Sequence, residues 1–284
     1  MTVGLTDAPV DGVMAVHVEF RGITLKPQSG PAIDFALSEK VQLLDLQNGS
    51  VFPLLDAQTV DAGRYNWIEL HTNAEIDGIL DSYVVESKSN GMVELEVPSG
   101  TVRLVSGFVV TAGKSNAVLL DWDVRKGLTD PEGLVSPSPD AKDAYKLTPA
   151  LRLIDMTQYG SLTGSVADAL IMAESCTSNA EGDGNLVYVY RNHDTTPDDL
   201  GSFGEPVTTA PVRSNPEKAG AYTYTVHYLD PGDYTVAFTC QGLDDDPATD
   251  AAEGAAVPDI EFSGQVNASV AEGEGTTNEA PPID

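Results

Sequence analysis

Residues 222–240 read YTYTVHYLDPGDYTVAFTC. Apolar or aromatic residues alternate with Thr and His on both sides of the Pro231-Gly232 turn, and a period of two is typical of β-strands. The same alternation recurs at Ala15–Phe20, Val93–Val97 and Leu186–Tyr190. Because these runs are rich in β-branched and aromatic residues and are separated by turn residues, the sequence predicts an all-β fold.

Turn signals and a scarcity of helical pattern refine this prediction. Asn90-Gly91 lies between two strand-like runs and suits a hairpin turn, because both residues tolerate positive φ. One short helix is expected at Val41–Leu46, where leucines could pack inward. Strands spaced about 8–12 residues apart indicate sandwiches or barrels. We therefore expect two β-sandwich domains in tandem, with prealbumin-like or Greek-key topology.

The chain of 284 residues is long enough for two domains. A closing strand is expected at Tyr145–Ile154 and an opening strand at Gly160–Val166, which places the boundary near residue 158. The domains are thus predicted at 1–158 and 159–270. Residues 129–143 are rich in Pro, Ser and Asp and are predicted to form a surface loop. Residues 271–284 lack periodicity and are predicted to be an acidic tail.

A short motif occurs in both halves of the chain. Asp61-Ala62-Gly63-Arg64-Tyr65 and Asp230-Pro231-Gly232-Asp233-Tyr234 both place a turn and a glycine ahead of a tyrosine and an alternating run. The glycine allows the turn, and the tyrosine is expected to bury its ring beside the strand that follows. The same pattern occurs in prealbumin-like sandwiches, so both halves are expected to share that architecture.

The charge is strongly acidic and unevenly distributed. Asp and Glu number 44 against 15 Lys and Arg, for a formal net charge of −29. Residues 158–284 carry 22 acidic and only 3 basic residues. Such a surface repels nucleic acid and anionic lipid, whose binding needs clustered Lys and Arg. The alternatives are a solvating surface, cation uptake and life in salty surroundings. No run of about 18 apolar residues occurs, so no helical membrane span is expected.

Cys176 and Cys240 are the two cysteines of the chain. An even number in a β region rich in Gly, Thr and Asp favours a disulfide, with two buried thiols as the alternative. A disulfide indicates export, because reducing compartments keep thiols free. No signal peptide is visible after Met1. A signal or anchor segment removed ahead of Thr2 would reconcile the two observations.

Several motifs follow one another in order along residues 3–158, namely Leu5-Thr6-Asp7-Ala8-Pro9, Ala62–Ile68, Asp121–Lys126 and Tyr145–Ile154. They resemble an uncharacterised domain family of bacterial surface lipoproteins that opens with the Leu-Thr-Asp-Ala-Pro motif. The second half resembles a carboxypeptidase-regulatory or prealbumin-like sandwich. The resemblance implies an exported protein of the cell surface or periplasm, attached to the membrane only through a removed N-terminal lipid anchor. It implies no established activity and no catalytic residues.

No motif for catalysis or metal binding stands out. The sequence has no Gly-x-Ser-x-Gly elbow, phosphate loop or His-Glu-x-x-His. The four histidines, His17, His71, His193 and His227, lack metal-ligand spacing, and no cofactor is expected from them. A glycosidase-like carboxylate pair needs only proximity in space, so 44 acidic residues make that criterion uninformative.

Two tryptophans are candidates for a binding surface. Trp122 lies between Asp121 and Asp123 and ahead of Arg125-Lys126. An exposed tryptophan could stack on a sugar and a buried one would anchor a core, and we favour the core for Trp122. The alternation around Trp67 leaves its face undecided.

Two acidic loops of the second half are the strongest candidates for a metal site. The candidate ligands are Asp244, Asp245, Asp246 and Asp250 in one loop and Asp194, Asp198 and Asp199 in the other. Ca²⁺ takes about six to eight oxygen ligands, which loops at one end of a sandwich could supply. Neither loop has EF-hand spacing, so calcium binding and solvated acidic loops both stay open.

The predicted function is a non-enzymatic exported module with a structural, adhesive or self-assembly role. Its expected partners are protein or glycan at the cell surface, or copies of itself through exposed strand edges. The alternatives are a carbohydrate-active or other hydrolase with paired carboxylates, and a periplasmic carrier with an apolar pocket.

Overall fold

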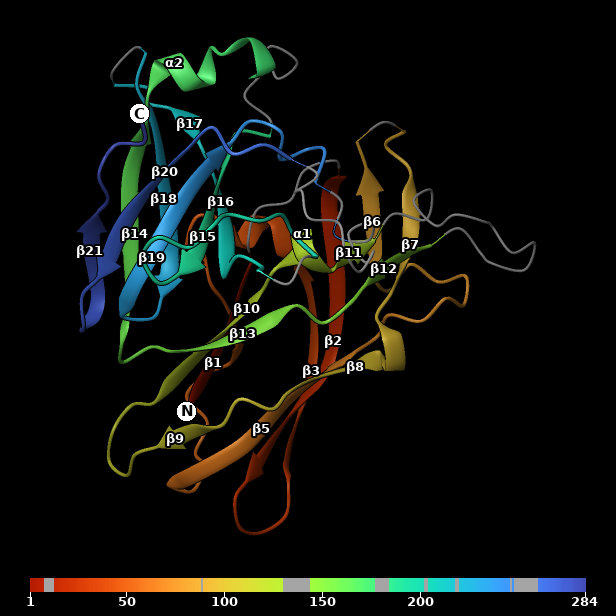
Figure 1. The fold of residues 1–284 in the computed structure, drawn as a ribbon. Helices are drawn as coiled ribbons and strands as arrows, with labels where there is room; N and C mark the ends of the chain where they lie inside the picture. The colour runs from red at the N-terminus through yellow and green to blue at the C-terminus, as the bar shows by residue number, and fades with distance from the viewer. Residues whose placement is uncertain are drawn as a thin grey trace. The chain divides into compact units, whose positions relative to one another are not determined.

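The structure is a computed structural model that describes residues 1–7, 13–87, 89–129, 144–176, 184–201, 204–217, 220–245, 247 and 260–284. The chain divides into two compact units, Met1–Met156 and Thr157–Asp284. Both units consist mainly of strands arranged in several sheets, so the predicted all-β class is confirmed (Figure 1). Residues 130–143, which cover nearly all of the predicted surface loop, lie outside the described residues.

The N-terminal unit contains a four-stranded and a nine-stranded sheet. The smaller sheet has the order β13 (Leu151–Asp155), β10 (Ala117–Trp122), β1 (Thr2–Asp7) and β4 (Phe52–Leu55). The path of the larger sheet runs through β11 (Leu128–Thr129), β12 (Tyr145–Leu147), β7 (Met92–Glu96), β6 (Tyr83–Glu86), β2 (Val13–Pro27), β5 (Gly63–Thr72) and β8 (Thr101–Leu104). Two further strands complete it: β3 (Ile33–Gln42) pairs with β2, and β9 (Phe108–Val110) pairs with β5.

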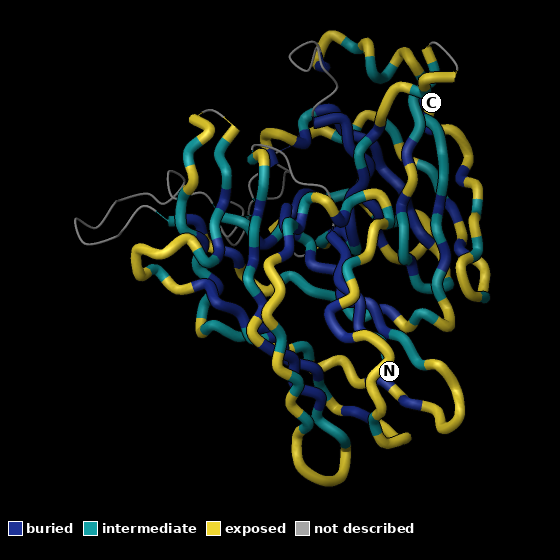
Figure 2. The backbone as a smooth tube through the Cα atoms, turned by 180° about the vertical axis from the view of Figure 1, so that it is seen from behind, coloured by how far each residue is buried: buried dark blue, intermediate teal, exposed yellow. Residues whose placement is uncertain are grey.

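The core of this unit lies between the two sheets. Along β2, Val16, Val18 and Phe20 alternate inward and are fully buried. Phe20 approaches Trp122 of β10, with ring centroids 6.4 Å apart, so side chains of both sheets meet. Figure 2 shows the burial alternating along the strands, with the exposed residues gathered in loops and hairpin tips. Trp122 is 0% exposed, and the prediction that it anchors the core is confirmed.

Short helical turns connect the strands of this unit. They are the 3₁₀ turns η1 (Leu43–Leu46) and η2 (Pro98–Gly100) and the single α-helical turn α1 (Val124–Gly127). The helix predicted at 41–46 is therefore shorter than expected, because residues 41 and 42 complete β3. Leu43 and Leu46 are buried as predicted. The Asn90-Gly91 hairpin between β6 and β7 is confirmed, with Asn90 at a φ of 53°.

The C-terminal unit consists of two four-stranded sheets. The first has the order β17 (Arg213–Ser214), β18 (Tyr222–Leu229), β14 (Tyr159–Val166) and β21 (Glu274–Glu279). The second has the order β16 (Thr208–Pro211), β15 (Leu186–Arg191), β19 (Gly232–Thr239) and β20 (Gly264–Val270). Two short turns, α2 (Asp168–Ile171) and η4 (Glu174–Cys176), follow β14. Side chains from both sheets form one core cluster, which includes Leu162, Val226 and Phe238.

The predicted acidic tail is wrong, because residues 271–284 belong to the C-terminal unit. β21 pairs in parallel with β14, from Tyr159↔Glu274 to Thr163↔Glu279. Beyond β21, the Ile283 amide donates to the Ser165 carbonyl at 2.9 Å, and the Ile283 side chain is fully buried. Backbone pairing with β14 therefore orders a segment whose composition lacks a strand pattern.

The repeated glycine–tyrosine motif has the same geometry in both units. The Tyr65 hydroxyl donates to the Asp61 carbonyl at 2.9 Å, and the Tyr234 hydroxyl donates to the Asp230 carbonyl at 2.7 Å. Both tyrosine rings are buried as expected. The glycine between the Asp and the Tyr of each motif has a positive φ, 146° at Gly63 and 150° at Gly232. Each motif thus ties a strand to the turn that precedes it. The prealbumin-like topology inferred from the motif stays a prediction.

Candidate functional site

A groove of about 600 Å³ lies on the nine-stranded sheet of the N-terminal unit. Its lining comes from β2, β3, β5, the loop that follows β5, and η2. The polar side chains that line it are Arg21, Thr24, Asp34, His71, Glu75, Thr72 and Ser99. The volume lies within the ~300–1,000 Å³ range of small-molecule sites.

The strand register explains why the groove forms at this place. Gly22 of β2 pairs with Ala36 on one side and His71 on the other. Because Gly22 has no side chain and Ala36 a small one, the sheet surface is low between β3 and β5. A Cβ at Gly22 would lie 3.0 Å from the Phe35 carbonyl oxygen and 3.5 Å from His71 Cδ2. Glycine therefore permits a close approach of neighbouring strands here.

Three lining residues form a directed chain of hydrogen bonds. Thr24 Oγ1 lies 2.6 Å from Asp34 Oδ1 and 2.7 Å from His71 Nε2. A carboxylate only accepts, so the Thr24 hydroxyl donates to Asp34 and accepts from His71 Nε2–H. A hydroxyl nucleophile would instead have to donate to the imidazole. These hydrogen bonds thus fix the His71 ring and the Asp34 carboxylate in place, and they do not activate Thr24 as a nucleophile.

Arg21 is held at the groove by a second set of hydrogen bonds. Its Nη2 donates to Asn73 Oδ1, and Asn73 Nδ2 donates to Glu19 Oε1 at 3.3 Å. The Ser82 hydroxyl donates to the Asn73 carbonyl at 2.7 Å. Asn73 therefore anchors the guanidinium, and Glu19 and Ser82 hold Asn73 in turn.

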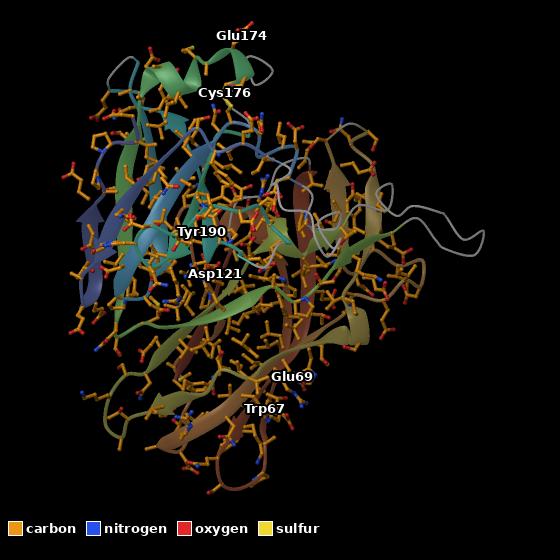
Figure 3. The ribbon with its side chains drawn as sticks, viewed as in Figure 1. Trp67, Glu69, Asp121, Glu174, Cys176 and Tyr190 are labelled. Carbon is orange, nitrogen blue, oxygen red and sulfur yellow. A yellow bond between two sulfur atoms is a disulfide. The ribbon has the colours of Figure 1, made fainter. Side chains whose placement is uncertain are left out.

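A charged cluster flanks the groove on β5 and β8. Arg103 Nε donates to Glu69 Oε2 at 2.7 Å, and its guanidinium lies over the Trp67 ring, 4.3 Å from the centroid. Glu69 Oε1 lies 3.9 Å from His71 Nε2. Trp67 and Glu69 project from β5 (Figure 3). Trp67 is therefore on the polar face, and Arg103 occupies one side of its ring.

The acidic residues next to Trp122 have structural partners. Asp121 forms an ion pair with Arg152, at 2.6 Å from Arg152 Nη2. Asp123 Oδ1 accepts from the Lys126 amide at 3.1 Å and caps α1. Burial raises the pKa of Asp123 to about 6, and burial also lowers the pKa of Lys126. Asp7 Oδ1 accepts from the Val124 amide at 3.1 Å. These motif residues join β1, β10 and α1, and none of them lines the groove.

The residues predicted as calcium ligands do not form one site among the described residues. Asp245 is buried, accepts from the Tyr188 hydroxyl and lies 3.3 Å from the Leu200 amide. Asp194 accepts from Asn267 Nδ2 at 2.8 Å. Asp244 is exposed, Asp198 accepts from the Asp199 amide, and Asp199 is buried. No group of three metal-ligating side chains occurs in the described part of the chain. Asp246 and Asp250 lie outside it, so calcium binding stays a prediction.

The acidic loops instead cover one face of a sheet. Tyr188 and Tyr190 of β15 form a small core cluster with Leu200, Ile260 and Phe262. The Tyr190 hydroxyl donates to the Asp198 carbonyl, and burial raises its pKa. The two loops therefore use part of their polar groups to bury tyrosine hydroxyls.

The histidines other than His71 have local roles. His17 stacks on Tyr83, with ring centroids 4.6 Å apart, and burial lowers its pKa. His193 Nε2 lies 3.1 Å from the Ala268 carbonyl oxygen. Burial lowers the pKa of His227, whose ring lies near that of Tyr228.

The predicted disulfide is confirmed. Cys176 of η4 and Cys240 after β19 are joined, with their Cα atoms 5.5 Å apart. Both are buried. Over the described residues, no helix combines the length and apolar character that a membrane crossing requires.

The sequence did not identify the groove. Thr24, Asp34 and His71 come from three strands and have no common spacing. The feature of the sequence that could have indicated the groove is Gly22 within an alternating strand, because a glycine inside a strand often marks a close approach of neighbouring backbones.

A family model described as a domain of unknown function, DUF4382, matches residues 1–149. No curated protein matches the chain. Among solved structures, a candidate adhesin from Bacteroides ovatus is similar, with 10% sequence identity and a TM-score of 0.22. The alignment covers 100% of this chain and 88% of the adhesin chain. The fimbrial anchor protein of Porphyromonas gingivalis has 13% identity, a TM-score of 0.20 and coverages of 85% and 78%. The shaft pilin of Lactobacillus rhamnosus has 11% identity, a TM-score of 0.20 and coverages of 100% and 98%.

Proposed function

The chain belongs to the family described as a domain of unknown function, DUF4382; because that name assigns no activity, we propose from the geometry that the protein is a non-catalytic binding module of the cell exterior. Its ligand lies in the groove of the N-terminal unit, and its biological role is adhesive or structural.

The observation that carries this proposal is the groove with its polar groups already fixed. Thr24 holds both Asp34 and His71, and Asn73 holds Arg21. Prearranged side chains lose little conformational entropy when a ligand binds. The direction of the Thr24 hydrogen bonds suits binding better than nucleophilic catalysis.

The hydrolase alternative finds less support. Catalytic acids usually have perturbed pKa values and lie in a cleft. Asp123 has a raised pKa of about 6, but it caps α1 and does not line the groove. A carrier with an enclosed apolar pocket is also disfavoured, because the groove is open and most of its lining residues are polar.

Two features support an extracytoplasmic location. The Cys176–Cys240 disulfide fits an oxidising environment. The net charge of −29 keeps the surface soluble and away from nucleic acid. Attachment through an N-terminal lipid anchor is part of the same proposal.

The test compares two matched variants of the full chain in a retention assay. Ala36→Trp fills the groove, whereas Ser38→Trp places the same side chain at an exposed position of β3 outside the lining. Beads coated with the wild type or with Ser38→Trp should be retained on mucin or on whole bacterial cells. Beads coated with Ala36→Trp should not.

Equal retention of all three proteins would contradict the groove as the binding site. Turnover of a chromogenic glycoside or ester by the purified wild type, lost in Asp34→Asn, would contradict the non-catalytic role. Melting temperatures of the variants check that each is folded.

A further inference from the structure

We infer that the ligand of the groove is a neutral carbohydrate. This inference rests on the proposed function, since it names the chemical class that the same groove binds.

The groove offers hydrogen-bonding atoms that the described residues leave unengaged. Asp34 uses Oδ1 toward Thr24, His71 uses Nε2, and Arg21 uses Nη2. Asp34 Oδ2, His71 Nδ1, Arg21 Nη1 and the Glu75 carboxylate therefore remain for a ligand, as far as the described chain shows. A sugar hydroxyl both donates and accepts, so vicinal hydroxyls can satisfy a carboxylate oxygen and a guanidinium N–H together.

Charge favours a neutral ligand. The groove combines one cation, Arg21, with two carboxylates, Asp34 and Glu75. An anionic ligand would be repelled by these carboxylates and by the net charge of −29. A cationic ligand would be attracted by the carboxylates, but it would lie beside the Arg21 guanidinium in the same groove. A ligand with many hydroxyls and no charge avoids contact with a like charge in both cases.

The shape of the groove also fits a carbohydrate better than a peptide. Gly22, Ala36 and Gly100 are the small residues of its lining, and the groove is open to solvent. An extended peptide would need apolar pockets for alternate side chains, and the lining is dominated by polar and small residues.

The test uses a printed array that carries neutral oligosaccharides, sialylated and sulfated oligosaccharides, and unmodified extended peptides. We expect the wild type and Ser38→Trp to bind neutral oligosaccharides. Ala36→Trp should bind them about tenfold more weakly or worse. Asp34→Asn, which leaves the Thr24 hydrogen bond possible, should weaken binding without changing the melting temperature.

Salt provides an independent readout. Binding of a neutral ligand should be nearly unchanged between low and physiological ionic strength, whereas binding of an ion should weaken as salt rises.

The outcomes separate the carbohydrate inference from the proposed function. Groove-dependent binding of peptides or anionic oligosaccharides would overturn the inference and leave the binding module standing. Binding of neutral oligosaccharides that Ala36→Trp does not weaken would overturn both. Absence of neutral oligosaccharide binding by the wild type would overturn the inference alone.

Discussion

Three tyrosines with buried rings, Tyr65, Tyr224 and Tyr234, differ in the hydrogen bonds of their hydroxyls. Tyr65 and Tyr234 donate to the carbonyls of Asp61 and Asp230. The Tyr224 hydroxyl is buried and has no hydrogen-bond partner among the described residues, and its ring lies against Gly164. Burial raises the pKa of Tyr224, because the phenolate would be poorly solvated there.

Replacing tyrosine with Phe should therefore lower the free energy of unfolding at Tyr65 and Tyr234, but not at Tyr224. Tyr65→Phe and Tyr234→Phe should each lower the free energy of unfolding by about 1 kcal/mol, because each variant loses the hydrogen bond between the strand and the preceding turn. Tyr224→Phe should leave it unchanged or raise it by up to about 1 kcal/mol, because an unsatisfied hydroxyl is removed. Urea unfolding of the three variants measures this. A loss of stability in Tyr224→Phe equal to the other two would contradict the assignment.

Asp123 makes the stability of the N-terminal unit depend on pH. Its pKa in the folded protein is about 6, above the ordinary value of 3.8, because burial disfavours the charged form. A raised pKa contributes stability that is full below about pH 4 and is lost as the pH rises through about 6.

Asp123→Asn should remove this loss of stability with rising pH, because an amide does not titrate. The variant should keep the helix cap, since Asn also caps helices well. Relative to the variant, the wild type should lose about 1–3 kcal/mol of stability between about pH 4 and pH 7. Thermal melts across this range provide the measurement. The control Asp56→Asn, at an exposed position, should have the same pH dependence of stability as the wild type. The same pH dependence in Asp123→Asn would refute the raised pKa of Asp123.

At the scale of elements, β21 shows how backbone pairing can order a polar segment. Its exposed side chains are Glu274, Thr277 and Glu279, and the segment contributes buried apolar groups only after the strand, at Ala280 and Ile283. β14 supplies the backbone partners along the whole segment.

Ile283→Ala should therefore destabilise the C-terminal unit by about 2–4 kcal/mol, as expected for a truncated core side chain. Thr277→Ala, at an exposed position of β21, should change stability by less than about 0.5 kcal/mol. Denaturant unfolding compares the two. Similar small effects in both variants would show that residues 280–284 are a loosely attached tail, as composition alone suggested.

The elements that the sequence predicts well are those whose side chains alternate. Ala15–Phe20 shows its burial directly, because one face of the strand contacts a core. Tyr234–Thr239 also has the predicted strand pattern, but it is buried on both faces, with Phe238 in one core cluster and Ala237 in another. β21 was missed because its order comes from pairing with β14. The groove was missed because Thr24, Asp34 and His71 meet only through the register of β2 with β3 and β5.

At the scale of the molecule, the C-terminal unit carries most of the net charge, with 22 acidic and 3 basic residues. Asp245 and Asp194 are engaged by Tyr188 and Asn267. We therefore expect Ca²⁺ and Mg²⁺ at equal ionic strength to raise the melting temperature equally, by screening like charges. A rise specific to Ca²⁺ and reversed by a chelator would instead support the calcium prediction and direct attention to Asp246 and Asp250.

The disulfide provides a test of whether the two units unfold independently. Cys176 and Cys240 are 64 residues apart and both belong to the C-terminal unit. Replacing both with Ala should lower the stability of that unit by about 2–4 kcal/mol, because the cross-link restricts its unfolded chain. Differential scanning calorimetry of the full chain should show that the transition of the C-terminal unit moves to lower temperature and that the transition of the N-terminal unit does not move.

Three controls assign the two transitions. Ile283→Ala should lower the transition of the C-terminal unit, and Asp123→Asn should move only the transition of the N-terminal unit. Dithiothreitol should reproduce the shift in the wild type and have no effect on the double variant. If both transitions shifted together on loss of the disulfide, the units would be coupled, and the division at residue 157 would not describe independent folding.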